Sequence, residues 1–542
     1  MKETSTPDQT RIFFRELKGY EGNKFMTKFK KELEELARRR AESRAMGAPE
    51  KVERQHQRGK KTVRERIDLL CDPGTFQEYG LLASHYGHQP DEPITPADGV
   101  ITGFGRINGR MAGIAADDFT VFGGSIGPVN LDKRWRMAKI AYQERVPMIY
   151  IMDGAGARAQ TLGRMAEGLP MVAHFITMAK SSGIAPQIGL IMGPCGGEPA
   201  LEAALLEFTI MVKGQGMIAA GGPPVVLASL GHVVDKEELG GVDIHCRITG
   251  TIHNPAEDEE DAISTVKRYL SYLPTNAYEY PPSIEPKDDP DRMDEELLEI
   301  LPENFKAPYD MKRIINCVVD KGSFFEILPL FAPMMITGLA RLNGHTIGVV
   351  ANQPAVYAGA ITAKAGQKER HFIDLCTAYH IPLLFIVDTP GVMTGPQSEK
   401  EGALKFGLAV AHSLAWADVP KFTMVIRKSF GFGGAAMCGY MGGQTLTLAW
   451  PTVDFASLPV DSAIQAAHRA ELAAAEDREA LWQELEKKYK KFAGVYPAAA
   501  SFNIDDVIDP RETRPRLVRA LELALNRRSA RPEPAMRHGV MP

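Results

Sequence analysis

Short apolar segments that run into glycine-rich turns recur along this chain. The clearest are IYIMDGAGARAQ (Ile149–Gln160) and LLFIVDTPGVMTGPQ (Leu383–Gln397), each with an aspartate where the apolar run stops. Such a run is typical of a buried strand, and the glycines mark the turn into a following helix. The first N–H groups of that helix have no partner within it and can hold negative charge. The pattern predicts an α/β protein.

The same pattern also predicts an internal duplication. Asp153 and Asp388 are separated by 388 − 153 = 235 residues. ITGFGRINGRMAGI (Ile101–Ile114) and ITGLARLNGHTIGV (Ile336–Val349) repeat at the same offset, and each contains an Asn-Gly pair that predicts a β-hairpin. Matches at one constant offset predict two copies of one fold. We expect the copies to pack around a pseudo-twofold axis with related pockets.

Composition shifts divide the chain into five predicted parts. A charged segment with little apolar content comes first, and a stretch rich in Pro, Asp and Glu separates the two copies. The tail is rich in Pro and Arg, which favours disorder. The predicted parts are a helical arm (1–70), a first domain (71–275), a linker (276–308), a second domain (309–530) and a disordered tail (531–542).

The overall composition is that of a globular protein: 44% of the 542 residues are apolar and 24% are charged. The formal net charge of −5 gives no reason to expect a nucleic-acid partner. Six cysteines without a CxxC pair predict reduced thiols and a cytoplasmic protein, and we find no apolar signal or membrane-spanning segment. The basic residues between Lys24 and Arg66 predict a solvated helical face that could attract the phosphates of a ligand.

Two glycine-rich turns between a strand and a helix are candidates for chemistry, one in each copy. They are GPCGGE (Gly193–Glu198) and GFGGAA (Gly431–Ala436). Backbone N–H groups at such a turn can converge on one oxygen and stabilise the negative charge of an enolate. The alternative is a tight turn in which glycine only permits close packing.

Other chemistries lack their sequence signatures. No GxSxG nucleophile motif and no GxxxxGK[ST] phosphate loop is present. The histidines are scattered, and each is more often a surface or core residue than a catalyst. We therefore expect no nucleotide and no metal to be bound by this chain.

Several motifs together resemble the carboxyltransferase (β) subunit of biotin-dependent acyl-CoA carboxylases, such as propionyl-CoA carboxylase. The resemblance extends from about Lys24 to Arg528 and implies two tandem crotonase-like domains of the ClpP/crotonase superfamily. One motif, DGAGAR, stands where the family usually has DSGGAR. The motifs are FGGSIG (Phe122–Gly127), DGAGAR (Asp153–Arg158), GPCGG (Gly193–Gly197), EELGG (Glu237–Gly241), DTPG (Asp388–Gly391), VIRKSFG (Val425–Gly431) and DDVIDPRETR (Asp505–Arg514).

The resemblance implies a reaction and its partners. Carboxybiotin on a separate carrier protein would release CO2, biotin would take the α-proton of an acyl-CoA, and the enolate would attack CO2. This chain has no biotin-acceptor lysine flanked by methionines, so the biotin carboxylase and the carrier should be separate chains. The family's active site lies between the first domain of one subunit and the second domain of another. We therefore expect a homo-oligomer, commonly a hexamer built as a trimer of dimers.

The family's site residues can be carried over by position. The first oxyanion hole, for the thioester oxygen, falls on Gly197 and Glu198, and the second, for the ureido oxygen of biotin, falls on Phe432 and Gly433. Asp153 and Asp388 become structural turns below the site. The predicted substrate-binding residues are Gly124, Ser125, Gly154, Ala155, Gly156, Ala157, Arg158 and Gly196; the predicted biotin-binding residues are Gly391, Val392, Gly431, Gly434 and Ala435.

The chain departs from the family at these same positions. Glu198 stands where a second glycine is usual, and Phe432-Gly433 stands where Gly-Ala is common. Glu198 is either a carboxylate at the start of a helix, where it interacts favourably with the helix dipole, or a general acid/base with a raised pKa. The alternatives to a carboxyltransferase are therefore a biotin-independent or decarboxylating acyl-CoA enzyme that uses Glu198, and an inactive paralogue that scaffolds an assembly.

Overall fold

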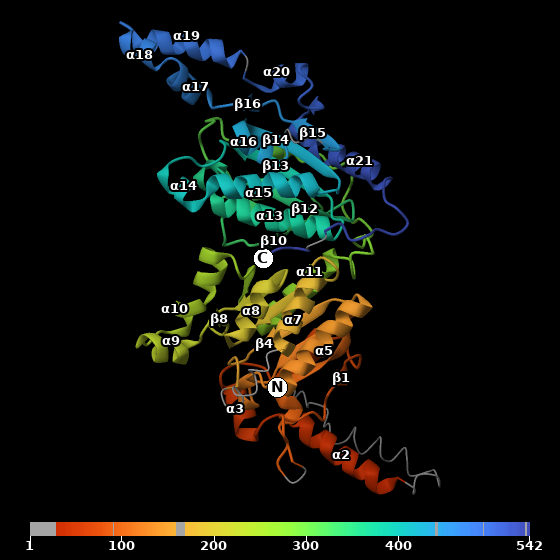
Figure 1. Cartoon of the computed structure of the whole chain (residues 1–542). Helices are drawn as coiled ribbons and strands as arrows, with labels where there is room; N and C mark the ends of the chain where they lie inside the picture. Colours follow the sequence, from red (N-terminus) through yellow and green to blue (C-terminus); the bar gives the residue numbers. More distant parts are fainter. Residues whose placement is uncertain (1–28, 90–91, 159–168, 440–442, 492, 537–538) are drawn as a thin grey trace, which may run out of the picture.

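The computed structural model describes residues 29–89, 92–158, 169–439, 443–491, 493–536 and 539–542, with the side chains of 169 and 170 left out. Two large sheets organise these residues, and helices cover them (Figure 1). The first sheet has the order β1 (Gln77–Tyr79), β2 (Val100–Ile107), β3 (Arg110–Asp117), β4 (Met148–Met152), β5 (Gln187–Ile191), β7 (Phe208–Val212) and β9 (Asn254–Ala256). The second has the order β10 (Phe325–Ile327), β11 (Met335–Leu342), β12 (His345–Asn352), β13 (Leu383–Thr389), β14 (Lys421–Phe430), β15 (Leu446–Ala449) and β17 (Asp506–Val507).

The pairing pattern repeats between the two sheets. Each starts with antiparallel strands and continues with parallel ones, as right-handed strand–helix–strand units require. The first hairpin pairs Val100 with Asp117, and the second pairs Met335 with Asn352, at the 235-residue offset. The predicted duplication and the two tandem α/β domains are confirmed. Three short strands lie beside the main order: β6 (Pro194–Gly196) pairs with β8 (Met217–Ala219), and β16 (Asp454–Ala456) pairs with β14.

Helices precede the first strand of each sheet, fill connections between its parallel strands, as the sequence pattern predicts, and follow its last strand. In the first half these are α2 (Lys30–Arg44), α3 (Pro49–Gln57), α4 (Val63–Leu70), α5 (Pro128–Glu144), α7 (Leu169–Ser181), α8 (Glu198–Leu205), α9 (Pro223–Leu230), α10 (Lys236–Gly240) and α11 (Glu259–Tyr272). In the second half they are α12 (Met311–Val318), α13 (Ala363–Ala378), α14 (Pro396–Glu401), α15 (Ala403–Trp416), α16 (Gly431–Ala436), α17 (Val460–Ala467), α18 (Arg469–Ala474), α19 (Arg478–Lys490), α20 (Val495–Ala500) and α21 (Thr513–Leu525). None of the helices in the described ranges is long and apolar enough to cross a membrane.

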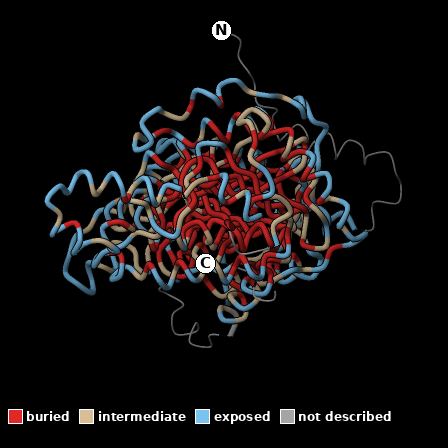
Figure 2. The backbone as a smooth tube through the Cα atoms, turned by 90° about the horizontal axis from the view of Figure 1, so that it is seen from above, coloured by how far each residue is buried: buried red, intermediate tan, exposed pale blue. Residues whose placement is uncertain are grey.

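The two halves share one apolar core. Phe208 of β7 stacks on Tyr269 of α11 with ring centroids 4.0 Å apart, and Phe325 of β10 lies 5.9 Å from Phe208. The Tyr379 hydroxyl, from the second half, donates a hydrogen bond to the buried Glu207 carboxylate at 2.6 Å. Figure 2 shows the buried residues gathered in the middle of the molecule and the exposed ones around its edge. The halves therefore pack as parts of one folded body.

The end of the chain differs from the prediction of a disordered tail. Val540 is buried, and its N–H and C=O both hydrogen bond to the Ser182 hydroxyl at 3.0 Å. The Met541 carbonyl lies 3.0 Å from Nδ1 of His371. The prediction is wrong for residues 539–542, because a few backbone hydrogen bonds and one apolar side chain fix them in the seam between the halves. Residues 1–28 of the predicted arm lie outside the described residues, and the domain boundaries stay predictions.

Candidate active site

A glycine turn follows the hairpin in each half and lies against the end of the next strand. In the first half it is the short helix Phe122–Gly124, and in the second half it is Tyr357–Gly359. Gly124 has φ +64°, and a Cβ there would lie 2.5 Å from the carbonyl oxygen of Asp153. Gly359 has φ +77° and would place a Cβ at the same distance from the carbonyl of Asp388. Only glycine fits either position.

A second glycine contact joins this turn to the next strand. Gly156 has φ +89°, and a Cβ on it would meet the Gly196 carbonyl at 2.3 Å. In the second half a Cβ on Gly433 would lie 2.5 Å from the Cα of Gly391. In each half, three turns therefore pack with backbone against backbone: the turn after the hairpin, the turn after the aspartate, and the oxyanion loop. Within each half this packing brings predicted site glycines close to one another.

The first-half helix starts at the predicted oxyanion loop, but one donor is already used. Gly197 is the N-cap of α8, and its N–H donates to the Ala219 carbonyl at 2.9 Å, extending the β6–β8 pairing. The prediction that Gly197 donates to a substrate oxygen is therefore wrong in this geometry. Among the described residues, the Glu198 N–H has no protein acceptor. It remains as the donor of this loop.

The second-half loop keeps its donors. α16 begins directly after β14, and the N–H groups of Phe432 and Gly433 donate to no described acceptor. Gly433 and Gly434 are buried, whereas the Phe432 side chain is 38% exposed. The Phe432 side chain, where the family commonly has glycine, lies against Gly407 of α15, and the N–H groups of the turn remain without a described acceptor.

The Glu198 carboxyl group is the most unusual polar group of the site. It is only 6% exposed, and neither of its oxygens has a hydrogen-bond partner in the part of the chain that the structure describes. Burial, helped by the nearby Glu202 carboxylate and opposed by Arg134, raises the pKa of Glu198 to about 7. A carboxyl group with that pKa can both take and give a proton near neutral pH.

A buried ionic network lies behind Glu198. Arg134 of α5 donates to Asp117 at the end of β3 and to Glu202 of α8, the latter at 2.9 Å. His174 of α7 contacts Glu202 at 3.0 Å. Burial would raise the pKa of Glu202, but Arg134 and His174 outweigh it and lower that pKa, whereas burial raises the pKa of Asp117 to about 6. Sequence analysis missed this network because no motif contains its members.

The two strand-end aspartates hold the turns rather than react. The Asp153 carboxylate is fully buried and pairs with Lys60 at 2.5 Å and with Arg66 at 3.0 Å. Asp388 accepts from the Tyr309 hydroxyl at 2.7 Å and from Arg427 at 3.0 Å. This agrees with their predicted structural role.

Two of the predicted substrate-binding side chains are also occupied. Arg158 pairs with Asp98 at 2.6 Å and donates to the Ser125 carbonyl at 2.9 Å, and the Ser125 hydroxyl donates to the Phe122 carbonyl at 2.8 Å. They fix the first turn against the 153–158 turn. The exposed groups of that segment are Ala155 and Ala157.

A cavity of about 710 Å³ opens beside the first turn. Its lining includes Phe122 of this turn and, from α2 and α3, Arg38, Arg39, Glu42 and Lys51. Arg38 and Arg39 also pair with Glu35, at 2.8 and 2.7 Å. This places part of the basic segment noted in the sequence next to the predicted substrate site.

Fold and site together define a carboxyltransferase built from two tandem crotonase-like domains. The chain belongs to the carboxyl transferase family: the model of the carboxyl transferase domain matches residues 54–541. The predicted family, fold class and enzyme class are confirmed.

Relatives of known name agree with this assignment. The propionyl-CoA carboxylase carboxyltransferase subunit of Haloferax mediterranei is 38% identical over 94% of this chain and 99% of its own length. The alpha subunit of methylmalonyl-CoA decarboxylase from Veillonella parvula is 35% identical over 95% and 100%. The transcarboxylase 12S hexamer structure with methylmalonyl-CoA and methylmalonic acid bound superposes with a TM-score of 0.87 at 36% identity, over 94% of this chain and 98% of that one.

Proposed function

We propose that this chain moves a carboxyl group between biotin and the α-carbon of a short acyl-CoA. The observation that carries the proposal is the pair of glycine loops at one offset: among the described residues, the Glu198 N–H in the first and the Phe432 and Gly433 N–H groups in the second have no acceptor at a helix start. The similarity to propionyl-CoA and methylmalonyl-CoA enzymes over more than nine-tenths of the chain supports a three- to four-carbon acyl group.

Each half would hold one reactant. In the first half the Glu198 N–H would donate to the thioester oxygen, and the 154–157 turn would line the acyl chain's path. The cations of the 710 Å³ cavity would attract the phosphates of coenzyme A. In the second half Phe432 and Gly433 would donate to the ureido oxygen, and the flanking positions Gly391, Val392, Gly431, Gly434 and Ala435 would form the rest of the cradle.

Biotin, when bound on its carrier, would supply the carboxyl group and a nitrogen base. The fit test is the backbone at this turn: a Cβ on Gly433 would lie 2.5 Å from the Cα of Gly391, and Gly391 has φ +119°, which disfavours any side chain there. Both positions therefore present backbone rather than side chains to a flat ring. We also propose that a separate biotin carboxylase and carrier serve this chain. A hexamer is the assembly we expect, as in the transcarboxylase 12S structure.

The direct test uses the purified chain with methylmalonyl-CoA and free biotin. We expect biotin-dependent loss of methylmalonyl-CoA with formation of propionyl-CoA, measured by chromatography and mass spectrometry. Turnover that is independent of biotin would contradict the proposal. No turnover of either this ester or malonyl-CoA, with folding and oligomeric state intact, would favour the scaffolding alternative.

A second function is favoured by one observation: the buried, unpaired Glu198 carboxyl group with a pKa of about 7. It fits an acyl-CoA enzyme that uses this group as acid or base, and a decarboxylase subunit is among the relatives. The variant Glu198→Gln separates the two functions, because it keeps the backbone N–H and removes the titrating group. Under the first proposal it retains carboxyl transfer. Loss of turnover by about 100-fold or more with acyl-CoA binding intact would favour the second.

A further inference from the structure

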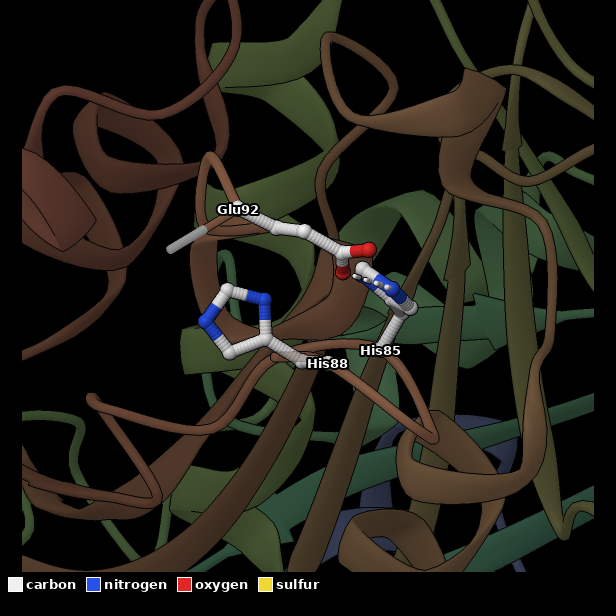
Figure 3. Close-up of side chains that lie close together, drawn as sticks. All are labelled: His85, His88 and Glu92. Atoms are coloured by element: carbon white, nitrogen blue, oxygen red, sulfur yellow. Dashed lines mark ion pairs between the residues drawn. The ribbon is translucent and has the colours of Figure 1, made fainter. Parts of the chain in front are cut away.

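A loop outside the catalytic turns gathers two histidines and a glutamate. His85, His88 and Glu92 lie in the connection between β1 and β2, and Figure 3 shows the His85 ring next to the Glu92 carboxylate with the His88 ring beside them. One nitrogen or oxygen from each residue lies within 4.8 Å of those of the other two. The Nε2 atom of His85 is 3.8 Å from the nearer oxygen of Glu92. We propose that this cluster is a binding site for a divalent transition-metal ion, with Zn²⁺ as the best match.

The backbone of the loop produces this convergence. The His88 N–H donates to the His85 carbonyl at 3.2 Å, and the Glu92 N–H donates to the Gln89 carbonyl at 3.1 Å. These two successive turns put the three side chains on one side of the loop. The start of the loop is tied to its end, because the Thr95 N–H donates to the Ser84 hydroxyl at 2.8 Å.

Thr95 orients one of the ligands. Its hydroxyl lies 2.8 Å from Nδ1 of His85, which leaves Nε2 facing the Glu92 carboxylate. A hydrogen bond to the far nitrogen is how proteins fix the tautomer and angle of a metal-binding histidine. The Nδ1 atom of His88 is buried and has no hydrogen-bond partner among the described residues. Coordination would give this atom a partner.

The chemistry of the set selects the ion. Two imidazoles and one carboxylate are a common donor set for Zn²⁺, bound at about 2.0–2.2 Å, with a fourth position left for water or an anion. Tetrahedral ligands at that distance are about 3.3 Å apart, so the loop needs to close by roughly 1 Å from its present spacing. Hard ions such as Mg²⁺ and Ca²⁺ prefer oxygen ligands, which makes them poor candidates.

The site adjoins the substrate region without belonging to the catalytic turns. His88 and Glu92 line the same 710 Å³ cavity as Arg38, Arg39 and Lys51. A metal ion bound by His85, His88 and Glu92 would add positive charge at the edge of this cavity and would link the three ligands to one another. Sequence analysis gave these histidines no role, because the H-x-x-H pair has no second motif at metal-site spacing. The contact of Thr95 with His85 becomes visible only in the fold.

The test is a Zn²⁺ titration of the full chain after removal of metal with a chelator. We expect one Zn²⁺ per chain by calorimetry and by elemental mass spectrometry, and tetrahedral Co²⁺ absorption when cobalt replaces zinc. His85→Ala and His88→Ala should each abolish the stoichiometric site. The matched control is His232→Ala, an exposed histidine outside the cluster, which should bind as the parent does.

Two conservative variants keep the test decisive if the alanine variants fold poorly. Glu92→Gln changes a half-exposed side chain and should remove tight binding. Thr95→Val should weaken binding by about 10–100-fold while it leaves all three ligands in place. Less than one equivalent of bound Zn²⁺, an octahedral Co²⁺ spectrum, or unchanged binding in the histidine variants would overturn the proposal.

Discussion

The two halves of this molecule keep the same backbone and differ in their buried charges. Gly124, Gly156 and Gly196 recur at the 235-residue offset as Gly359, Gly391 and Gly431, and the first pair keeps the same 2.5 Å contact with a strand-end aspartate. The strand-end aspartates Asp153 and Asp388 recur as well, but four other buried polar side chains of the first half do not. Asp117, Arg134, Glu198 and Glu202 of the first half correspond to Asn352, Glu369, Gly433 and Met437 of the second.

The difference shows which features the fold needs and which the reaction can vary. The contacts of Gly124 and Gly359 are fixed, because a Cβ on either would lie 2.5 Å from a backbone carbonyl oxygen. The backbone N–H of the strand-end aspartate needs an acceptor in both halves, and Asp117 and Asn352 both provide one at 3.1 Å. Beyond that acceptor, the first half carries a full ionic network, while the second half leaves Glu369 buried without a hydrogen-bond partner. Burial raises the pKa of Glu369 well above its usual value.

The largest expected effect comes from replacing, one at a time, the matched residues Arg134 and Glu369. Arg134→Met leaves Asp117 and Glu202 as uncompensated buried carboxylates, which should cost about 3–5 kcal/mol. Glu369→Gln replaces a carboxyl group whose pKa burial already raises well above its usual value, so we expect a change within about 1 kcal/mol. Calorimetric unfolding of the two variants at one protein concentration measures both. Equal losses in the two variants would contradict the asymmetry.

The next test uses pH at Glu198, which has no counterpart in the second half. Its pKa is raised from 4.5 to about 7 in the folded chain, so between these values the folded state holds a proton that the unfolded state has lost. This contribution to stability is complete below about pH 4.5 and falls by up to about 3 kcal/mol as the pH rises through 7. Glu198→Gln should therefore be more stable than the parent at pH 8, and the gap should shrink toward pH 5. A gap that does not change with pH would contradict the raised pKa.

A third test adds a methyl group to one glycine in each half. Gly156→Ala and Gly433→Ala both force backbones apart, and a displacement near 1 Å in an active site costs about 100-fold in rate. Gly156→Ala should impair every reaction of the acyl-CoA. Gly433→Ala should impair only the biotin-dependent reaction and leave acyl-CoA binding unchanged.

Gly214→Ala is the control for that pair, since its φ is +67° but an added Cβ meets nothing within 4 Å. It should cost about 1 kcal/mol in stability and leave the kinetics as they are. Loss of acyl-CoA binding in Gly433→Ala, measured by equilibrium titration, would contradict the proposal that the first half binds the acyl-CoA and the second half binds biotin.

The smallest expected effects lie at the related helices α4 and α12, whose N-caps differ. Thr62 forms a reciprocal capping box with Glu65, whereas Asp310 accepts one N–H from Lys312. Thr62→Ala and Asp310→Ala should each cost about 1 kcal/mol. The double variant should show the sum, because the caps share no contact. A clear excess over the sum in thermal unfolding would reveal coupling between the halves.

Sequence alone determined the parts of this protein that depend on local pattern. Apolar runs, Asn-Gly pairs and glycine turns specify strands, hairpins and helix starts within a few residues, and their repetition at one offset specified the duplication. The motifs were sufficient to predict the family. The structural role predicted for Asp153, after β4, and for Asp388, near the end of β13, agrees with their buried ion pairs. These features are encoded by residues that are neighbours in the chain.

Only the tertiary structure decided which polar groups are free. The Gly197 N–H is used by a strand more than 20 residues away, and Arg158 is held by Asp98, 60 residues away. The Arg134 network, the cations on Asp153 and the docked C-terminal residues also join distant segments. Hydrogen bonds and ion pairs depend on distances of tenths of an ångström between such segments, and no periodic pattern in the sequence records them.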